Sequence, residues 1–349
     1  RPGCISVSGW PSGKVGMAGG SLKIEIEPPP LAIIVTGATC GGKSKRALDI
    51  SRDTGLPVNV MDSMKVYRGM DIGSAKPAEE LRNGKPYQMV DLVDPWEEFT
   101  VFDWLSALGE SASSKDPWLI SGGTVFYLHA LREGIFQGPG PDDVIRERLK
   151  AESKSIGGDY LHDKLKEVDP DAALMIHRHD HKRLVRALEV HEQSGEPISV
   201  WHKRRVPILD PDKTLLIGVH RERQEVHRRI KARVVRMFTE GWIDEVQRLL
   251  DAHDPPWSDT AGQSIGYQRL SQALKEGTDP FLEADKIIAL NRALARSQLV
   301  WARKLPIEWF APDEGDRVNE RVQSALDAVK EGRPIDPPDR ELMARRRTV

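Results

Sequence analysis

The chain has 349 residues, which gives ample material for a buried core and for two lobes. Its composition, 39% hydrophobic and 30% charged, is that of an ordinary globular protein. The net charge is −2, so any binding of nucleic acid must depend on local basic surfaces. The two cysteines, Cys4 and Cys40, exclude a disulfide framework and favour a reducing compartment. No apolar run approaches the roughly 18 residues that span a membrane, so we expect no membrane partner.

The first segment, residues 1–30, is rich in Gly, Ser and Pro, and this composition predicts a disordered leader. Met17 within it is a candidate start residue. The leader lacks the apolar core of a signal peptide, and its few basic residues give little support to an organelle transit peptide. We therefore expect a cytoplasmic protein.

The first predicted strand, Leu31–Val35, runs directly into a glycine-rich loop, and residues 45–52 have helix-forming composition. The loop fits the pattern G-x-x-x-x-G-K-[ST] in the strand–loop–helix context that this pattern requires. Backbone N–H groups of such a loop bind phosphate, Lys43 adds a positive charge, and the Ser44 hydroxyl is a ligand for Mg²⁺. The pattern predicts a polyphosphate site without distinguishing a nucleotide from another diphosphate. The predicted site comprises Gly37, Ala38, Thr39, Cys40, Gly41, Gly42, Lys43 and Ser44.

Two polar residues follow predicted strands farther along the chain. Asp62 follows the short strand Pro57–Met61, and Thr124 follows the strand Trp118–Ser121 and a Gly-Gly turn. Open α/β sheets place their ligands at the carboxyl ends of strands, but each residue also suits the cap of a helix. The segment after Asp62, Met64–Pro77, lacks periodicity and contains two glycines, so we expect a loop that contacts substrate.

A helical, charged region without strand-like runs extends from Asp142 to about His202, and it predicts an insertion between the two halves of the α/β core. Lys182 and Arg186 share one helical face, which by itself is most simply a solvated surface. The expected divisions are a leader at 1–30, a core at 31–140 and 206–312, an insertion at 141–205, and a C-terminal helix with a basic tail at 313–349. Within that last division we expect disorder from Pro334.

The predicted strand Leu215–Val219 returns the chain to the sheet and leads into a long helix over residues 223–239. One face of this helix carries Arg229, Arg233 and Arg236, a spacing that suits a diphosphate or RNA phosphates. The alternation of strands and helices predicts an α/β fold: a parallel sheet of the P-loop NTPase type flanked by helices, with an all-helical insertion lobe.

The segment D-S-M-K-V-Y-R-G-M-D-I-G-S-A-K-P, from Asp62 to Pro77, resembles the signature of the tRNA dimethylallyltransferases, and similar segments follow it in the same order. They cover roughly residues 31–310. They are Y-Q-M-V-D-L-V-D-P from Tyr87, G-G-T from Gly122 with Tyr127, V-D-P from Val168 through R-A-L-E at Glu189, G-W from Gly241 to Val246, I-G-Y from Ile265, and Gln298, Trp301 and Arg303.

This resemblance implies transfer of a dimethylallyl group from dimethylallyl diphosphate to N6 of the adenosine 3′-adjacent to the tRNA anticodon, by a monomer that uses Mg²⁺. It implies Asp62 as the general base, with Lys43 and Thr124 as further catalytic residues, and Arg229 and Arg233 on the diphosphate. It also implies that the helical insertion binds the anticodon stem. The implied tRNA contacts are Asp62, Ser63, Met64, Lys65, Thr124, Arg146, Lys182, Arg183, Arg186, Ile265, Gly266 and Tyr267.

Tyr267 and Trp301 are both candidates to stack on unpaired bases, and each could equally be a core residue. For Trp301 the core position is the favoured interpretation. The sequence departs from the family pattern at Ala38, Gly41, Arg296, Ser297 and Val300, and we expect an active but divergent member.

Three alternatives are a P-loop kinase of a small molecule, an isopentenyltransferase of free adenine nucleotides, and an RNA-binding protein without activity. The basic insertion favours tRNA over a free nucleotide. The presence of Lys43, Asp62 and Thr124 argues against a decayed enzyme.

Overall fold

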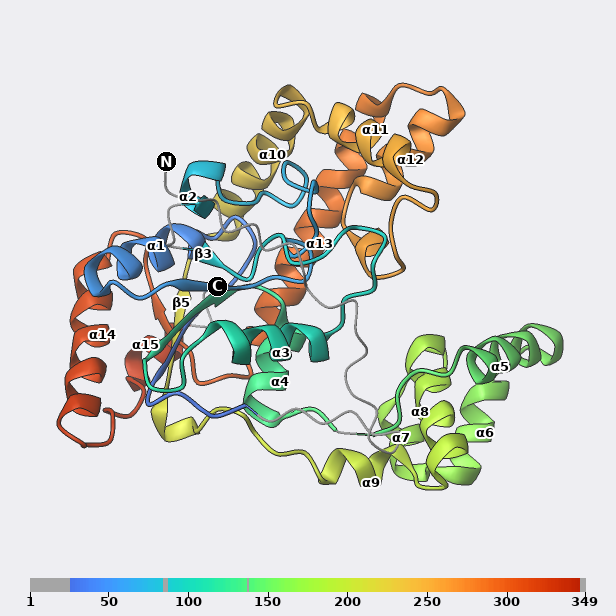
Figure 1. Ribbon diagram of the computed structural model, residues 1–349, viewed down its shortest axis with the longest axis horizontal. Helices are drawn as coiled ribbons and strands as arrows, with labels where there is room; N and C mark the ends of the chain where they lie inside the picture. The colour runs from blue at the N-terminus through green and yellow to red at the C-terminus, as the bar shows by residue number, and fades with distance from the viewer. Residues whose placement is uncertain (1–25, 84–86, 137, 346–349) are drawn as a thin grey trace, which may run out of the picture. The chain divides into compact units, whose positions relative to one another are not determined.

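A computed structural model describes residues 26–83, 87–136 and 138–345, and its described part contains one six-stranded parallel sheet in the order β3-β2-β4-β1-β5-β6 (Figure 1). Of the predicted leader, residues 1–30, positions 1–25 lie outside the described residues. The sheet order places the carboxyl ends of β2, β4, β1 and β5 next to one another. The strands are β1 (Ala32–Thr36), β2 (Val58–Met61), β3 (Tyr87–Gln88), β4 (Trp118–Gly122), β5 (Thr214–Val219) and β6 (Glu308–Phe310).

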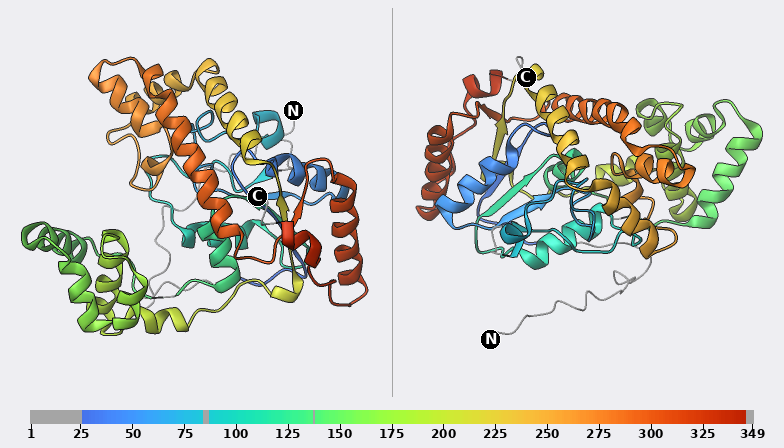
Figure 2. Two further views of the ribbon diagram at one scale, coloured as in Figure 1. Left: turned by 180° about the vertical axis from the view of Figure 1, so that it is seen from behind. Right: turned by 90° about the horizontal axis from the view of Figure 1, so that it is seen from above.

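The central strands are buried along their whole length because helices pack on both sides of the sheet (Figure 2). Trp104, for example, is fully buried and donates its Nε1–H to the carbonyl of Val60 at 3.1 Å. This architecture confirms the predicted fold class. The helices around the sheet are α1 (Lys43–Thr54), α2 (Glu79–Asn83), α3 (Val101–Ser111), α4 (Val125–Glu133) and α14 (Gly315–Lys330).

Four further helices come after β5 in the chain. Of these, α10 packs against α13, and α11 packs against α12 (Figure 1). The predicted arginine stripe lies on α10, whose bounds match the helix expected from the sequence. These helices are α10 (Arg223–Thr239), α11 (Trp242–Ala252), α12 (Tyr267–Glu276) and α13 (Ala284–Ala302), with short 3₁₀ turns at Pro211–Lys213, Ala261–Gln263 and Pro280–Glu283.

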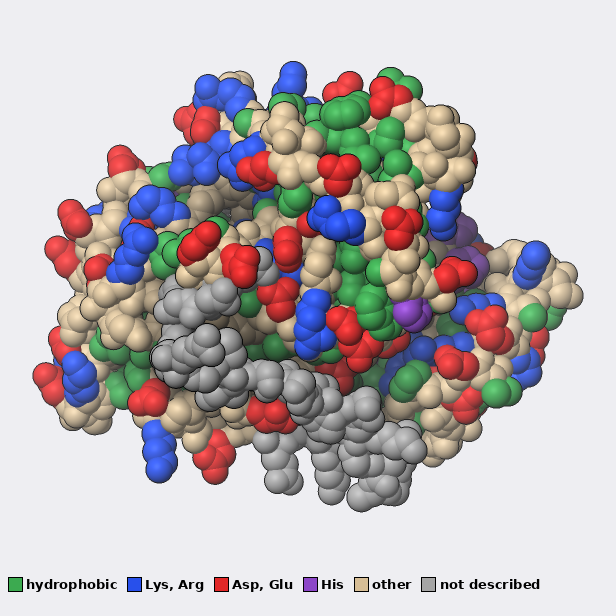
Figure 3. All heavy atoms as spheres, turned by 45° about the horizontal axis from the view of Figure 1, so that its top comes forward, with side chains coloured by type: hydrophobic (Ala, Val, Ile, Leu, Met, Phe, Trp, Pro, Cys, Tyr) green, Lys and Arg blue, Asp and Glu red, His purple; other side chains and the backbone are tan. Residues whose placement is uncertain are grey.

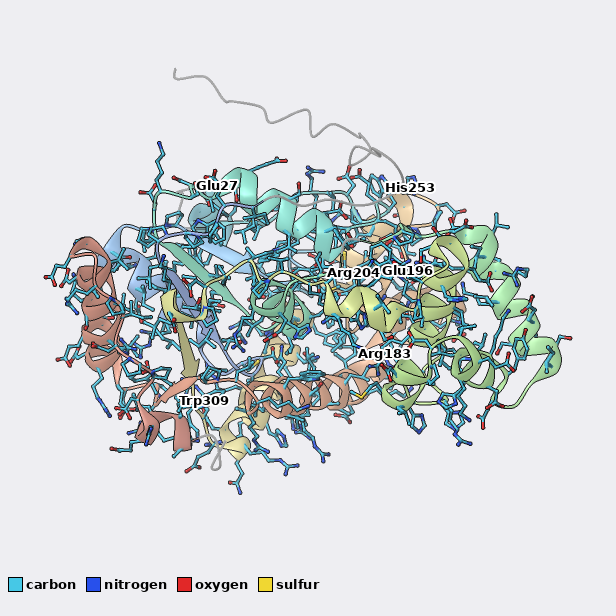
Figure 4. All side chains as sticks on the ribbon, turned by 90° about the horizontal axis from the view of Figure 1, so that it is seen from below. Glu27, Arg183, Glu196, Arg204, His253 and Trp309 are labelled. Atoms are coloured by element: carbon cyan, nitrogen blue, oxygen red, sulfur yellow. The ribbon has the colours of Figure 1, made fainter. Side chains whose placement is uncertain are left out.

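Residues 133–207 form a separate compact helical unit, and residues 26–132 with 208–345 form the other. The helical unit has its own apolar core, in which Leu149, Leu165, Leu184 and Leu188 are almost completely buried. At its surface, Arg204 pairs with Glu196 at 2.7 Å (Figure 4). Its helices are α5 (Asp143–Ile156), α6 (Tyr160–Val168), α7 (Pro170–Met175), α8 (His181–Ser194) and α9 (Ile198–Lys203).

The expectation of disorder from residue 334 is wrong for residues 334–345. The short helix α15 (Arg340–Ala344) packs against β6 and buries Leu342. The backbone N–H of Asp339 donates to the buried carboxylate of Glu308 at 2.7 Å, and Arg345 donates to the carboxylate of Glu314 at 2.5 Å. Composition alone missed these partners because both glutamates lie on other elements.

Basic and acidic side chains are interspersed over the face drawn in Figure 3, in keeping with a net charge of −2. Within the described residues, no helix combines the length and the apolar character that crossing a membrane requires.

Candidate active site

A cavity of about 1060 Å³ opens at the carboxyl end of the sheet and is lined by the residues that follow β1, β2 and β4, together with α10 and α13. Among the described residues that line it, Asp62 is the only carboxylate, and the cationic side chains are Lys43, Lys45, Lys65, Arg229, Arg233 and Arg236. A concave site with this charge balance attracts a polyanion.

The phosphate loop, residues 37–44, leads into the N-terminus of α1 in a form suited to binding an anion. Gly42 is the N-cap with φ of 111°, a left-handed conformation that a side chain rarely adopts, and no side chain caps the helix. The first turn contains no acidic residue. The N–H groups of this turn and the positive end of the helix dipole are thus available to a phosphate group.

Basic side chains from other elements hold the phosphate loop from outside. Arg229 Nε donates to the carbonyl of Cys40 at 2.9 Å, and Arg221 Nε donates to the carbonyl of Gly41 at 2.8 Å. Arg233 donates to the Thr39 hydroxyl at 3.2 Å. The structure therefore brings both arginines predicted from the sequence, Arg229 and Arg233, to this loop.

Lys43 lies among like charges in the cavity, and its Nζ donates to the carbonyl of Ala38 at 2.7 Å. Burial, and then the neighbouring charge of Lys65, lower the pKa of Lys43 to about 8, although Asp62 acts in the opposite direction. Burial also lowers the pKa of Lys65. A bound polyanion would favour the charged form of both lysines, so the site gains most from a ligand with several negative charges.

The loop that begins at Asp62 is joined to the turn after β4. Asp62 Oδ1 accepts the N–H of Met64 at 2.9 Å and that of Lys65 at 3.4 Å, and the structure gives Oδ2 no hydrogen bond to any described residue. The N–H of Ser63 donates to the Thr124 hydroxyl at 3.1 Å. The Asp62 carboxylate, Thr124 and Lys43 thus share one cavity, with one carboxylate oxygen left for a ligand.

Gln298 of α13, which the sequence showed only as part of a motif, links two walls of the cavity. Its Oε1 accepts the N–H of Thr39 at 2.7 Å, and its Nε2 donates to the carbonyl of Gly123 at 2.9 Å. A Cβ on Gly123 would lie 2.4 Å from that Nε2, so a larger residue there would require Gln298 to shift. Gln298 therefore connects the phosphate loop to the turn that carries Thr124.

Gln298→Glu is expected to weaken the binding of inorganic pyrophosphate at least tenfold. The glutamate keeps the bond from Thr39 but loses its donor to Gly123 and adds a negative charge to the cavity. Titration calorimetry measures the change. Gln263→Glu adds the same charge at an exposed position of the lining and is expected to change the affinity less than threefold. Equal effects of the two changes would contradict a linking role for Gln298.

The other predicted contacts on this unit are divided between the cavity and the core. Ile265 and Met64 line the cavity. Of the two alternatives left open for Tyr267, base stacking is wrong and the core position is confirmed, because its ring is fully buried and its hydroxyl donates to Glu245 at 2.6 Å. Gly266 is buried beside Trp242. Trp301, interpreted from the sequence as core, is 48% exposed and lines the cavity.

In the helical unit, two of the four basic residues predicted to contact tRNA pair with a buried carboxylate. Arg146 and Arg186 both pair with Glu189, at 2.7 and 2.6 Å, and this carboxylate is completely buried. These pairs neutralise the buried carboxylate, and both arginines remain partly exposed, so their contact with RNA stays a prediction. Lys182 and Arg183 are exposed, although Arg183 also pairs with Asp180.

The residues present fit a Mg²⁺ ion whose ligands would come mostly from a bound diphosphate. The exposed hydroxyl of Ser44 lines the cavity at the N-terminus of α1, and hydroxyl oxygen is a ligand that Mg²⁺ accepts together with phosphate oxygens. Among the described residues, no cluster of three or more His, Cys, Asp or Glu side chains could hold a metal by itself.

Comparisons with known proteins identify the family to which this chain is similar. The family model described as IPP transferase matches residues 65–305, and the model described as Isopentenyl transferase matches residues 31–92. The tRNA dimethylallyltransferase of Geobacter sulfurreducens is 40% identical over 79% of this chain and 90% of its own length. That of Stenotrophomonas maltophilia is 37% identical over 84% of this chain and 96% of its own.

The crystal structure of the tRNA isopentenylpyrophosphate transferase from Bacillus halodurans matches with a TM-score of 0.59 and 29% identity, covering 86% of this chain and 98% of that one. The matched sequence spans the phosphate loop, the Asp62 loop, the helical unit and α13. The chain therefore belongs to the IPP transferase family, the family of the tRNA dimethylallyltransferases.

Proposed function

We propose that the protein transfers a dimethylallyl group from dimethylallyl diphosphate to N6 of the adenosine 3′-adjacent to the anticodon of tRNA. The observation that carries this proposal is the cavity itself. It combines a phosphate-binding helix N-terminus, a surplus of cationic side chains and a single described carboxylate, Asp62, with an oxygen free to accept a proton. Family membership supports the same reaction.

In this reaction the bond between C1 of the allyl group and the diphosphate oxygen breaks, and a bond from N6 of adenosine to C1 forms. Lys43, the amides at the start of α1, Arg229 and Arg233 stabilise the negative charge that develops on the departing diphosphate. Asp62 accepts the proton that N6 loses as its new bond forms. Mg²⁺, held by Ser44 and the diphosphate, would supply further charge neutralisation when bound.

Thr124 and the residues around it would orient the acceptor. Its hydroxyl already accepts a hydrogen bond from the N–H of Ser63, so it fixes the start of the 62–77 loop beside Asp62. The exposed Lys182 and Arg183 of the helical unit would contact the phosphates of the anticodon stem. We expect a monomer, and the tRNA substrate suits a cytoplasmic location.

Label transfer tests the proposal directly. The protein is incubated with Mg²⁺ and dimethylallyl diphosphate labelled in the allyl group, and with either tRNA or AMP as acceptor. We expect label in tRNA and none in AMP. Label in AMP alone would identify an isopentenyltransferase of free nucleotides, and label in neither would reject prenyl transfer. Release of labelled phosphate from ATP in a parallel reaction would favour a P-loop kinase.

A further inference from the structure

Glu245 on α11 is a buried carboxylate that binds a loop rather than a cation. Its Oε2 accepts the N–H groups of Asp71 at 2.9 Å and Ile72 at 2.7 Å. Its Oε1 accepts the N–H of Gly73 at 3.2 Å and the hydroxyl of Tyr267 at 2.6 Å. A carboxylate has about four acceptor sites, so all of them are used. These bonds fasten three successive residues of the 62–77 loop to α11 and α12.

The loop segment that Glu245 holds continues into the wall of the cavity. Gly73, Ser74 and Ala75 line the cavity, and so does the segment 263–265 that leads to Tyr267. These lining residues carry no charge, whereas the cationic side chains come from the phosphate loop, α1, α10 and Lys65. An uncharged wall suits the planar adenine ring, and the cationic part of the cavity suits the diphosphate.

Close packing makes the position of this wall sensitive to small changes. Trp242 and Tyr267 are almost completely buried and meet edge to face with ring centroids 5.7 Å apart. Gly73 lies directly against them: a Cβ there would be 2.2 Å from Trp242 Nε1 and 2.6 Å from Tyr267 Cε2. The loop therefore packs against closely packed rings. If its hydrogen bonds to Glu245 change and the loop shifts, these rings have no space to adjust to it.

We propose that Glu245 is a positioning residue for the acceptor nucleoside. By accepting all four hydrogen bonds, it sets the place of the wall at Gly73–Ala75 and thereby the place of the target base against Asp62. The inference rests on the proposed function, and it assigns a role to the G-W…E-V and I-G-Y segments. Transfer between well-placed groups depends steeply on their separation.

Glu245→Gln tests this role with little change of shape. In one orientation the NH₂ group of the new amide faces the N–H groups of Asp71 and Ile72. In the other it faces the N–H of Gly73 and the Tyr267 hydroxyl, which can turn to accept. Either way at least one backbone hydrogen bond to the loop is lost, so the loop must move. We expect kcat/KM for tRNA to fall at least 30-fold, mostly through a higher KM for tRNA. The affinity for inorganic pyrophosphate should stay within threefold of wild type, because the phosphate loop is untouched. Kinetics with labelled dimethylallyl diphosphate and calorimetry measure the two quantities.

Two further variants keep the test decisive. Tyr267→Phe removes one donor and leaves the three N–H bonds, so kcat/KM for tRNA should change less than fivefold. Gly73→Ala displaces the same segment from the side of Trp242 and should reproduce the pattern of Glu245→Gln. If Glu245→Gln and Gly73→Ala both also lose pyrophosphate binding, the role of Glu245 is in folding alone, and the proposal is overturned.

Activity of Glu245→Gln within threefold of wild type would also overturn it. A wild-type protein that binds pyrophosphate but transfers no label to tRNA would reject the proposed function and this inference together. An active wild type with an equally active Glu245→Gln would reject this inference alone.

Discussion

Asp62→Asn is expected to lower kcat for prenyl transfer to tRNA by about 10²–10⁴-fold, the usual contribution of a positioned general base. The asparagine keeps an oxygen for the N–H groups of Met64 and Lys65, so the 62–77 loop should hold its conformation. What is lost is the group that accepts the proton from N6. Single-turnover transfer from labelled dimethylallyl diphosphate measures the effect.

Asp49→Asn is the matched control, since Asp49 pairs with the exposed Lys45 at 2.9 Å and does not line the cavity. It should leave kcat within twofold of wild type. Binding of inorganic pyrophosphate to Asp62→Asn should be unchanged or tighter, because a negative charge near Lys43 is removed. A loss of kcat smaller than tenfold would mean that Asp62 is not the base.

Lys43→Met is expected to lower kcat by about 10²–10³-fold, the range seen when one preorganised donor to a developing negative charge is removed. Methionine retains most of the apolar stem and removes the ammonium group that stands at the phosphate loop. The affinity for inorganic pyrophosphate should fall as well. Label transfer and calorimetry at pH 7 measure both quantities.

The pH dependence gives a second measure of the same group. Because burial and Lys65 lower the pKa of Lys43 to about 8, the free protein carries the Lys43 charge below pH 8 and loses it as the pH rises through that value. Pyrophosphate affinity should therefore decline above pH 8 in the wild type, and the decline should be shallower in Lys43→Met. Burial also lowers the pKa of Lys65, so its titration adds to the decline in both proteins.

Lys45→Ala is the control for charge alone. Lys45 also lines the cavity, but its side chain is 83% exposed and paired with Asp49, so water screens its charge. We expect a change in pyrophosphate affinity of less than threefold. If Lys45→Ala and Lys43→Met weaken binding equally, the cavity acts through its net charge and Lys43 has no special position.

The sequence was informative wherever the chemistry lies within one short segment. The strand–loop–helix around Lys43 and the loop that begins at Asp62 follow from local composition, and the structure places both on the same cavity. The arginine row of α10 also follows from local spacing, because residues three and four apart share a helical face. Spacing alone did not show that these arginines contact the phosphate loop.

Contacts between distant segments decided the rest. Gln298 binds the N–H of Thr39 across 259 positions of the chain, and Glu245 binds Ile72 across 173, so no local pattern could pair them. The pairing of Arg186 with the buried carboxylate of Glu189 likewise joins side chains whose partnership the predicted RNA contact did not suggest. The sequence also does not distinguish a buried aromatic ring from an exposed one.

By itself, then, the sequence determined a parallel α/β protein with a phosphate-binding loop, a nearby carboxylate and a helical insertion, because each of these depends on neighbouring residues along the chain. The tertiary structure decided which side chains stand in the cavity and which only support it. Tyr267, for which a core position was left open, is buried, and Trp301, expected in the core, is exposed. Burial depends on what packs against a helix from elsewhere in the chain.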